Sequence, residues 1–135
     1  MRSMHPFTAT VLALLVFTAH PALGAAPMTT AESMARATVE GYMAGLISGN
    51  TAELSKFITP DFRKERQSLL ESPGYGQVLL NSYAGATFSI SDARETTEGK
   101  VEVDAEIHLQ DGGMMHVRFL VAPTDGRGYG IDAEY

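Results

Sequence analysis

The segment from Val101 to Gln110 alternates strictly between apolar and polar side chains, and this pattern restricts the fold more than any other. Its odd positions are valine, alanine, isoleucine and leucine, while its even positions are acidic or polar. Because successive side chains of a strand point to opposite faces, a period of two is typical of a strand with one buried face. We therefore expect a half-buried strand of an antiparallel sheet here.

A tight turn at Asp111-Gly112-Gly113 is expected to reverse the chain into a second strand from Met114 to about Ala122. If these three residues form the loop, Gln110 opposes Met114 and apolar residues oppose apolar residues along the hairpin. The predicted pairs are Leu109 with Met115, Ile107 with Val117, Ala105 with Phe119, and Val103 with Val121.

A two-residue loop is less favourable, because it would set Ile107 opposite His116 and mix the two faces of the hairpin. The three-residue loop instead places His108 opposite His116 on the polar face. It also places Glu106 opposite Arg118, as an exposed cross-strand ion pair.

The chain before this hairpin has the period of helices. From Thr29 to Ser48 apolar residues recur every three or four positions, at Ala35, Val39, Tyr42, Met43, Leu46 and Ile47. Thr29 and Glu32 have the spacing of a capping box, and Gly49-Asn50 is typical of a helix end. This segment is predicted to be a long helix with one buried face.

Shorter elements are expected before and after the β-hairpin and after the long helix. Thr51 is expected to cap a helix through Phe57, and Thr59-Pro60 to begin another that runs to about Glu71. The charged run Arg63-Lys64-Glu65-Arg66 is then the solvated face of that helix. Residues 75–83 fit either a helical turn or an irregular piece.

Two further strands are expected, one beginning at Phe88 and Ile90 and one running through Ile131 to Tyr135. Helices first and four meandering strands afterwards indicate an α+β fold. The predicted arrangement has N-terminal helices packed on one face of a C-terminal four-stranded antiparallel sheet.

The first 24 residues are typical of a signal peptide. Arg2 is followed by an apolar run from Val11 to Ala19 and by small residues at Ala22 and Gly24. The run is about half the roughly 20 residues that a membrane-spanning helix needs, so no stable membrane anchor is expected. We predict a cleaved segment 1–24 and a single domain at 25–135, exported to the periplasm or secreted.

Charge and cysteine content exclude several functions. The whole chain has a formal net charge of −6, and loss of Arg2 with the signal peptide makes the domain one unit more negative. Such a surface repels phosphate backbones, so no nucleic-acid partner is expected. The absence of cysteine excludes thiol catalysis and cysteine-bound metal or haem, and we expect no cofactor.

The order of elements and several local patterns resemble the nuclear transport factor 2-like superfamily, with its cystatin-like α+β cone. The residues that carry the resemblance are the segment from Tyr42 to Asn50, Leu54, Phe57, the Thr59-Pro60-Asp61-Phe62 element and the segment from Tyr129 to Asp132. The resemblance implies a pocket between the sheet and the helices. It does not imply a reaction, because one fold serves many functions.

Two tyrosines are candidates for that pocket. Tyr42 and Tyr83 could place hydroxyl groups between the first helix and the sheet, although core packing is their simpler role. An isomerase- or cyclase-like enzyme would additionally need a carboxylate or histidine in the pocket. Asp61, Asp92 and Asp132 are acids whose facing the sequence leaves open.

The predicted pair of His108 and His116 is a candidate metal site. Two imidazoles on adjacent strands, with Met114 and Met115 beside them, form a soft ligand set that suits copper. The simpler interpretation is two ordinary histidines on a solvated sheet, with Met115 in the core opposite Leu109.

These patterns favour an exported, non-enzymatic domain that binds a small apolar ligand or a protein partner. The alternatives are an acid–base enzyme and metal binding through His108 and His116. A homodimer is also left open, although a polar sheet face argues against a large apolar dimer patch.

Overall fold

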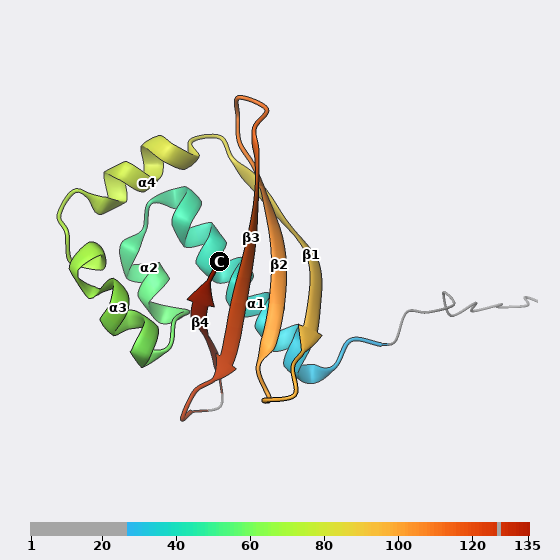
Figure 1. Cartoon of the computed structure of the whole chain (residues 1–135). Helices are drawn as coiled ribbons and strands as arrows, with labels where there is room; N and C mark the ends of the chain where they lie inside the picture. The colour runs from blue at the N-terminus through green and yellow to red at the C-terminus, as the bar shows by residue number, and fades with distance from the viewer. Residues whose placement is uncertain (1–26, 127) are drawn as a thin grey trace, which may run out of the picture.

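The computed structural model describes residues 27–126 and 128–135, in which four helices precede four strands (Figure 1). The helices are α1 (Thr30–Ser48), α2 (Thr51–Lys56), α3 (Pro60–Leu70) and α4 (Tyr75–Tyr83). The strands are β1 (Thr87–Glu95), β2 (Val101–His108), β3 (Met114–Pro123) and β4 (Tyr129–Glu134). The predicted α+β fold is confirmed. The predicted signal peptide, residues 1–24, lies outside the described residues.

The ends of the helices follow from local hydrogen bonds. The Thr29 hydroxyl accepts a hydrogen bond from the Glu32 backbone N–H at the start of α1, and Gly49 ends this helix with a φ of 66°. Thr59 caps α3 as predicted, with Pro60 as its first residue. The prediction that Thr51 caps α2 was wrong, because the side chain of Asn50 accepts the hydrogen bond from Glu53 instead.

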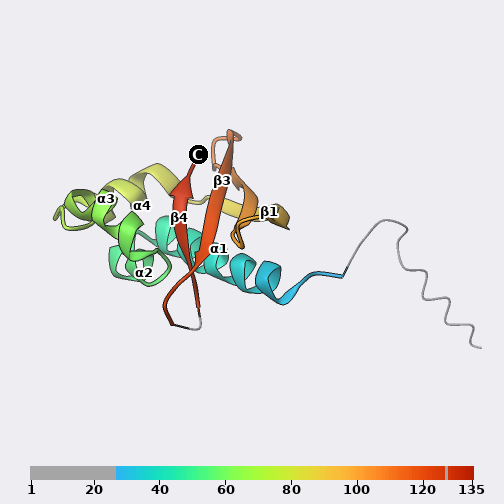
Figure 2. The same cartoon turned by 60° about the horizontal axis from the view of Figure 1, so that its bottom comes forward.

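The four strands form a meander in the order β1-β2-β3-β4, and every pair is antiparallel. Helix α1 crosses beneath all four strands, while α2, α3 and α4 gather beside β4 (Figures 1 and 2). No described helix covers the opposite face of the sheet, which we call the outer face. Among the described helices, none combines the length and the apolar character that crossing a bilayer requires.

The β2–β3 hairpin has the predicted loop length at a different position. The Leu109 backbone N–H donates to the Gly113 carbonyl, so the loop comprises residues 110–112 instead of 111–113. Gly112, with a φ of 92°, takes the left-handed position that closes this turn. Moving the loop by one residue shifts the strand register by two.

A register shift of two residues keeps every side chain on its predicted face but changes its partner. The observed apolar pairs are Val101 with Val121, Val103 with Phe119, Ala105 with Val117, and Ile107 with Met115. The two registers match apolar residues equally well, so the hydrophobic pattern could not choose between them. Met115 lies opposite Ile107 instead of Leu109, and it is exposed instead of buried in the core.

The core lies between α1 and the inner face of the sheet. Phe119 is completely buried, and its ring packs edge-to-face on Tyr42 of α1 with centroids 5.7 Å apart. The apolar stripe predicted for α1 supplies the other side of this core, where Ala35, Val39 and Met43 have no exposed surface.

Strand β4 contains a bulge that changes which side chains face the helices. Ile131 pairs with Val121 and Ala133 with Leu120, which leaves Asp132 as an extra residue between them. Glu134 therefore pairs with Phe119 on the inner face, whereas strict alternation from Ile131 would have turned it outward. The parallel bridge between Ile58 and Ile131 ties the same strand to the chain before α3.

Candidate binding sites

Glu134 is the centre of a polar group on the inner face, which we call the tyrosine cluster (Tyr42, Tyr75, Tyr83, Arg66 and Glu134). The Tyr42 hydroxyl donates to Glu134 Oε2 over 3.4 Å, and Arg66 Nη2 lies 3.9 Å from the same oxygen. The Arg66 guanidinium also lies over the Phe62 ring, 5.0 Å from its centroid. Helices α1, α3 and α4 and strand β4 all contribute to this cluster.

The three tyrosines of the cluster are held in their neutral form. Burial, and after it the negative charge of Glu134, raises the pKa of Tyr42 well above its usual range. Burial likewise raises the pKa values of Tyr75 and Tyr83, and Glu134 adds to both increases. These hydroxyls are therefore hydrogen-bond donors near neutral pH and poor bases.

Little space remains beside these tyrosines. The cavity between α1, α3 and α4 has a volume of about 10 Å³, and Tyr42, Phe62, Arg66 and Tyr75 are among its lining residues. About one water molecule fits such a volume. Tyr83, the other predicted pocket residue, is half-buried against the core and does not line this cavity.

The sequence left open which way Asp61, Asp92 and Asp132 face, and none of these three acids lies beside Tyr42. Asp132 accepts hydrogen bonds from the Thr59 hydroxyl at 2.7 Å and from Lys100 at 3.3 Å. Asp92 pairs with Arg94 on the outer face, and Asp61 is exposed in the first turn of α3.

The acid beside Tyr42 is Glu134, which the sequence did not single out because a bulge, not the alternation, turns it inward. Arg66 was also missed. Its place in a charged run predicted a solvated side chain, whereas it packs on Phe62 near Glu134. The spacing of Phe62 and Arg66, four residues apart on a helix, was the one signal available for that contact.

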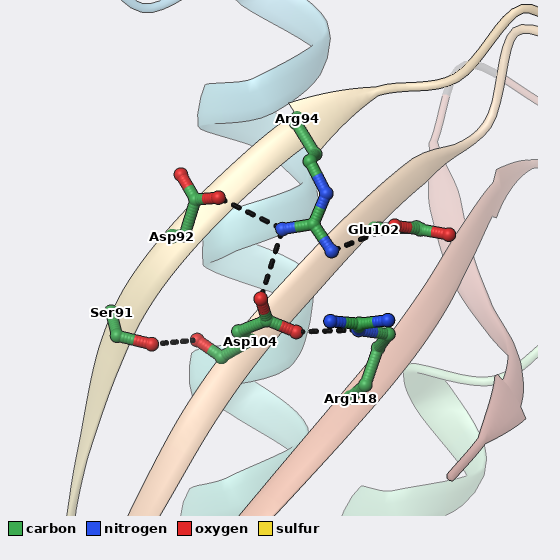
Figure 3. A network of polar contacts seen from close by, with 6 residues as sticks. All are labelled: Ser91, Asp92, Arg94, Glu102, Asp104 and Arg118. Carbon is green, nitrogen blue, oxygen red and sulfur yellow. Dashed lines mark hydrogen bonds and ion pairs between the residues drawn. The ribbon is translucent and has the colours of Figure 1, made fainter.

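The outer face carries a network of ion pairs on the side of the strands away from α1 (Figure 3). Asp104 joins two arginines: it accepts from Arg118 Nε at 2.8 Å and from Arg94 Nη1 at 2.9 Å. Arg94 also contacts Asp92 and Glu102, each at 2.8 Å. The hydrogen bonds from Arg118 and Arg94 lower the pKa of Asp104, so its carboxylate remains ionised well into acidic solution.

The predicted cross-strand partners on this face were wrong because of the register shift. Arg118 lies opposite Asp104 and not Glu106, and His116 lies opposite Glu106 and not His108. His108 lies opposite Met114.

The two histidines nevertheless meet the same carboxylate. His108 Nε2 is 3.5 Å from Glu106 Oε2, and His116 Nδ1 is 3.7 Å from Glu106 Oε1. Both imidazoles are exposed. Within residues 27–126 and 128–135, no group of three or more histidine, aspartate or glutamate side chains has the geometry of a metal site.

The largest hollow among those described lies on the outer face. It has a volume of about 750 Å³, and the charged side chains of β2 and β3 line it together with Tyr135. A smaller apolar groove of about 410 Å³ lies between the end of α1 and the start of β1, lined by Ile47 and Phe88 among others.

We compared the chain with protein-family models, with curated proteins and with solved structures, and none of them matches it.

Proposed function

We propose that this protein is an exported, non-enzymatic domain that binds a protein partner on the outer face of its sheet. The observation that carries the proposal is the contrast between two volumes. About 10 Å³ is free between α1, α3 and α4 beside the tyrosine cluster, whereas about 750 Å³ is open on the outer face. Pockets for small organic ligands are usually about 300–1,000 Å³ and enclose most of the ligand.

Two further features of the outer face support a protein partner. Its hollow is open and is lined mostly by charged and polar side chains, which suits contact with another protein surface better than capture of a small apolar molecule. Tyr135 and Met114 also remain 72% and 51% exposed on this side of the molecule. Tyrosine and methionine are both enriched at protein interfaces.

We also propose that the domain is a member of the nuclear transport factor 2-like superfamily. The support is the order of elements, with a long first helix beneath a meandering sheet and two short helices before α4. The contacts of Thr59 with Asp132 and of Ile58 with Ile131 join two of the segments that carry the resemblance.

An acid–base enzyme is the second candidate, and Glu134 favours it. A carboxylate 3.4 Å from a buried tyrosine hydroxyl is the combination that an isomerase- or cyclase-like reaction would need. We rank it second because a cavity of about 10 Å³ leaves no room for a substrate beside these groups. Metal binding by His108 and His116 ranks third, since neither belongs to a group of three or more histidine, aspartate or glutamate side chains with metal-site geometry in the described part of the chain.

Site-specific cross-linking tests the proposed function. The chain has no cysteine, so a single introduced cysteine can carry a photoactivated cross-linker. Ser89 is exposed on the outer face opposite Glu106, and Ser68 is exposed on α3. In the exporting cells, we expect Ser89→Cys to give a defined adduct with another protein, and the control Ser68→Cys to give none.

Equal adducts from both positions, or none from Ser89→Cys, would contradict a docking site on the outer face. Native mass spectrometry of the exported protein supplies a second check. A tightly retained small molecule would contradict the proposal and favour the notion of an interior ligand site. The measured mass also tests the predicted cleavage after residue 24.

A further inference from the structure

We infer that the partner segment bound by the outer face is extended and cationic, with Glu106 as its main electrostatic contact. This inference rests on the proposed function, because it specifies the chemistry of the partner for the same surface.

The charges of the outer face do not balance. Four carboxylates, from Asp92, Glu102, Asp104 and Glu106, face two guanidinium groups, from Arg94 and Arg118. Both arginines are already engaged by carboxylates at 2.8 to 2.9 Å. A partner with anionic groups would therefore have to displace existing ion pairs of the arginines. A cationic partner instead meets a surplus of negative charge.

Glu106 is the carboxylate of this face that an incoming cation can reach with least competition. Its charged neighbours within 4 Å, in the part of the chain that the structure describes, are His108 and His116. The other three carboxylates of this face are each bound by Arg94 at 2.8 to 2.9 Å. Across β1, Glu106 faces the small hydroxyl side chain of Ser89, which leaves the approach open.

The shape of the outer face suits an extended segment. The hollow of about 750 Å³ includes Glu106 and His116 and continues past Arg118 to Tyr135, across neighbouring strands. Exposed Tyr135 and, at the hairpin, exposed Met114 offer apolar contacts to the same segment. A peptide that alternates basic and apolar residues would match this surface, and the net negative charge of the protein would attract it.

Titration of the mature chain with three synthetic peptides of equal length tests the inference. One peptide alternates lysine with valine, one has glutamate in place of lysine, and one has serine. A tryptophan in each peptide reports binding by fluorescence, because the protein has no tryptophan. We expect the lysine peptide to bind best, with NMR shifts centred on Glu106.

Variants separate a specific contact from general attraction to an acidic protein. Glu106→Gln should weaken binding about two- to fivefold, as expected for one exposed ion pair. Ser89→Lys, which adds a cation opposite Glu106, should weaken it further. The matched control Glu65→Gln removes the same charge from the exposed face of α3 and should change nothing.

Equal losses of affinity for the lysine peptide in Glu106→Gln and Glu65→Gln would overturn the inference, because the peptide would then be attracted by the net charge of the protein and not by Glu106. If the serine or glutamate peptide binds best and moves the NMR signals of the outer face, the inference that the bound segment is cationic is overturned. The proposed function, a docking site for a protein on this face, would still stand. If no peptide moves the NMR signals of the outer face and Ser89→Cys also gives no cross-linked adduct, both the inference and the proposed function are overturned.

Discussion

The two faces of the sheet are built from alternate residues of the same strands, yet they differ in almost every physical property. On the inner face of β2, Val101, Val103, Ala105 and Ile107 are buried against α1. On the outer face, the intervening Glu102, Asp104 and Glu106 remain partly exposed, the first two in ion pairs with Arg94 and the third in contact with two histidines. Burial of apolar area stabilises the fold strongly, whereas exposed ion pairs contribute little. The inner face therefore holds the domain together, and the outer face is free to serve recognition.

Replacing the central side chain of the inner face should have the largest effect. Phe119→Ala removes a fully buried ring that packs on Tyr42, so we expect a loss of about 3 to 5 kcal/mol in the free energy of unfolding. Urea unfolding measures this loss. The control Met114→Ala, on the exposed outer side, should stay within about 0.5 kcal/mol of the wild type. Similar losses of unfolding free energy in both variants would contradict the proposed difference between the inner and outer faces.

The hairpin loop sets which residues oppose each other on both faces, and its position can be tested separately. Gly112 has a φ of 92°, so Gly112→Ala should cost about 1 to 2 kcal/mol. The control Gly74→Ala should cost less, because Gly74 has a φ of −95° and an added Cβ would meet nothing within 4 Å. Urea unfolding again gives the comparison. Equal losses in the two variants would contradict the left-handed conformation of Gly112 and with it the loop at 110–112.

The ion pairs of the outer face should have a small effect at neutral pH and a distinct dependence on acid. Asp104→Asn should lose no more than about 1 kcal/mol, because water screens these exposed pairs. The pKa of Asp104 is lowered in the folded state, so its contribution is present above the unfolded pKa of about 3.9 and is lost as the pH falls below it. Chemical unfolding near neutral pH and below about pH 4 should show the two proteins converging in acid.

The smallest neutral-pH effect is expected for Tyr42→Phe, about 0.5 kcal/mol, because the hydrogen bond to Glu134 is long at 3.4 Å. The difference in stability between Tyr42→Phe and the wild type should depend more clearly on pH in alkaline solution. The pKa of Tyr42 is raised above its ordinary value of 10.0, so this tyrosine stabilises the fold fully below about pH 10 and loses that contribution as the pH rises. Unfolding measured up to about pH 11 should therefore show a shallower decline for Tyr42→Phe; an unchanged decline would mean that Tyr42 is not held neutral by the fold.

Much of the fold could be predicted because its signals are local. Thr29 and Thr59 each cap the helix that follows them, and the alternation in β2 identified every buried residue of that strand. The candidate sites depended on longer-range geometry. Tyr42 was found from its place on an apolar helix face, but its partner Glu134 lies 92 residues further along the chain and faces inward through a bulge.

The sequence by itself determined the class of fold, the boundaries of α1 and α3 and the faces of the β2 residues, because side-chain period and capping act within a few residues. Only the tertiary structure decided the partners of those residues. Two registers of the β2–β3 hairpin bury the same apolar side chains, so the backbone of Gly112 and the packing of the whole sheet chose between them. That choice set Glu106 between His108 and His116, and the bulge at Asp132 set Glu134 beside Tyr42. Both arrangements depend on strands meeting in space, and a local pattern carries no information about where its partner strand will lie.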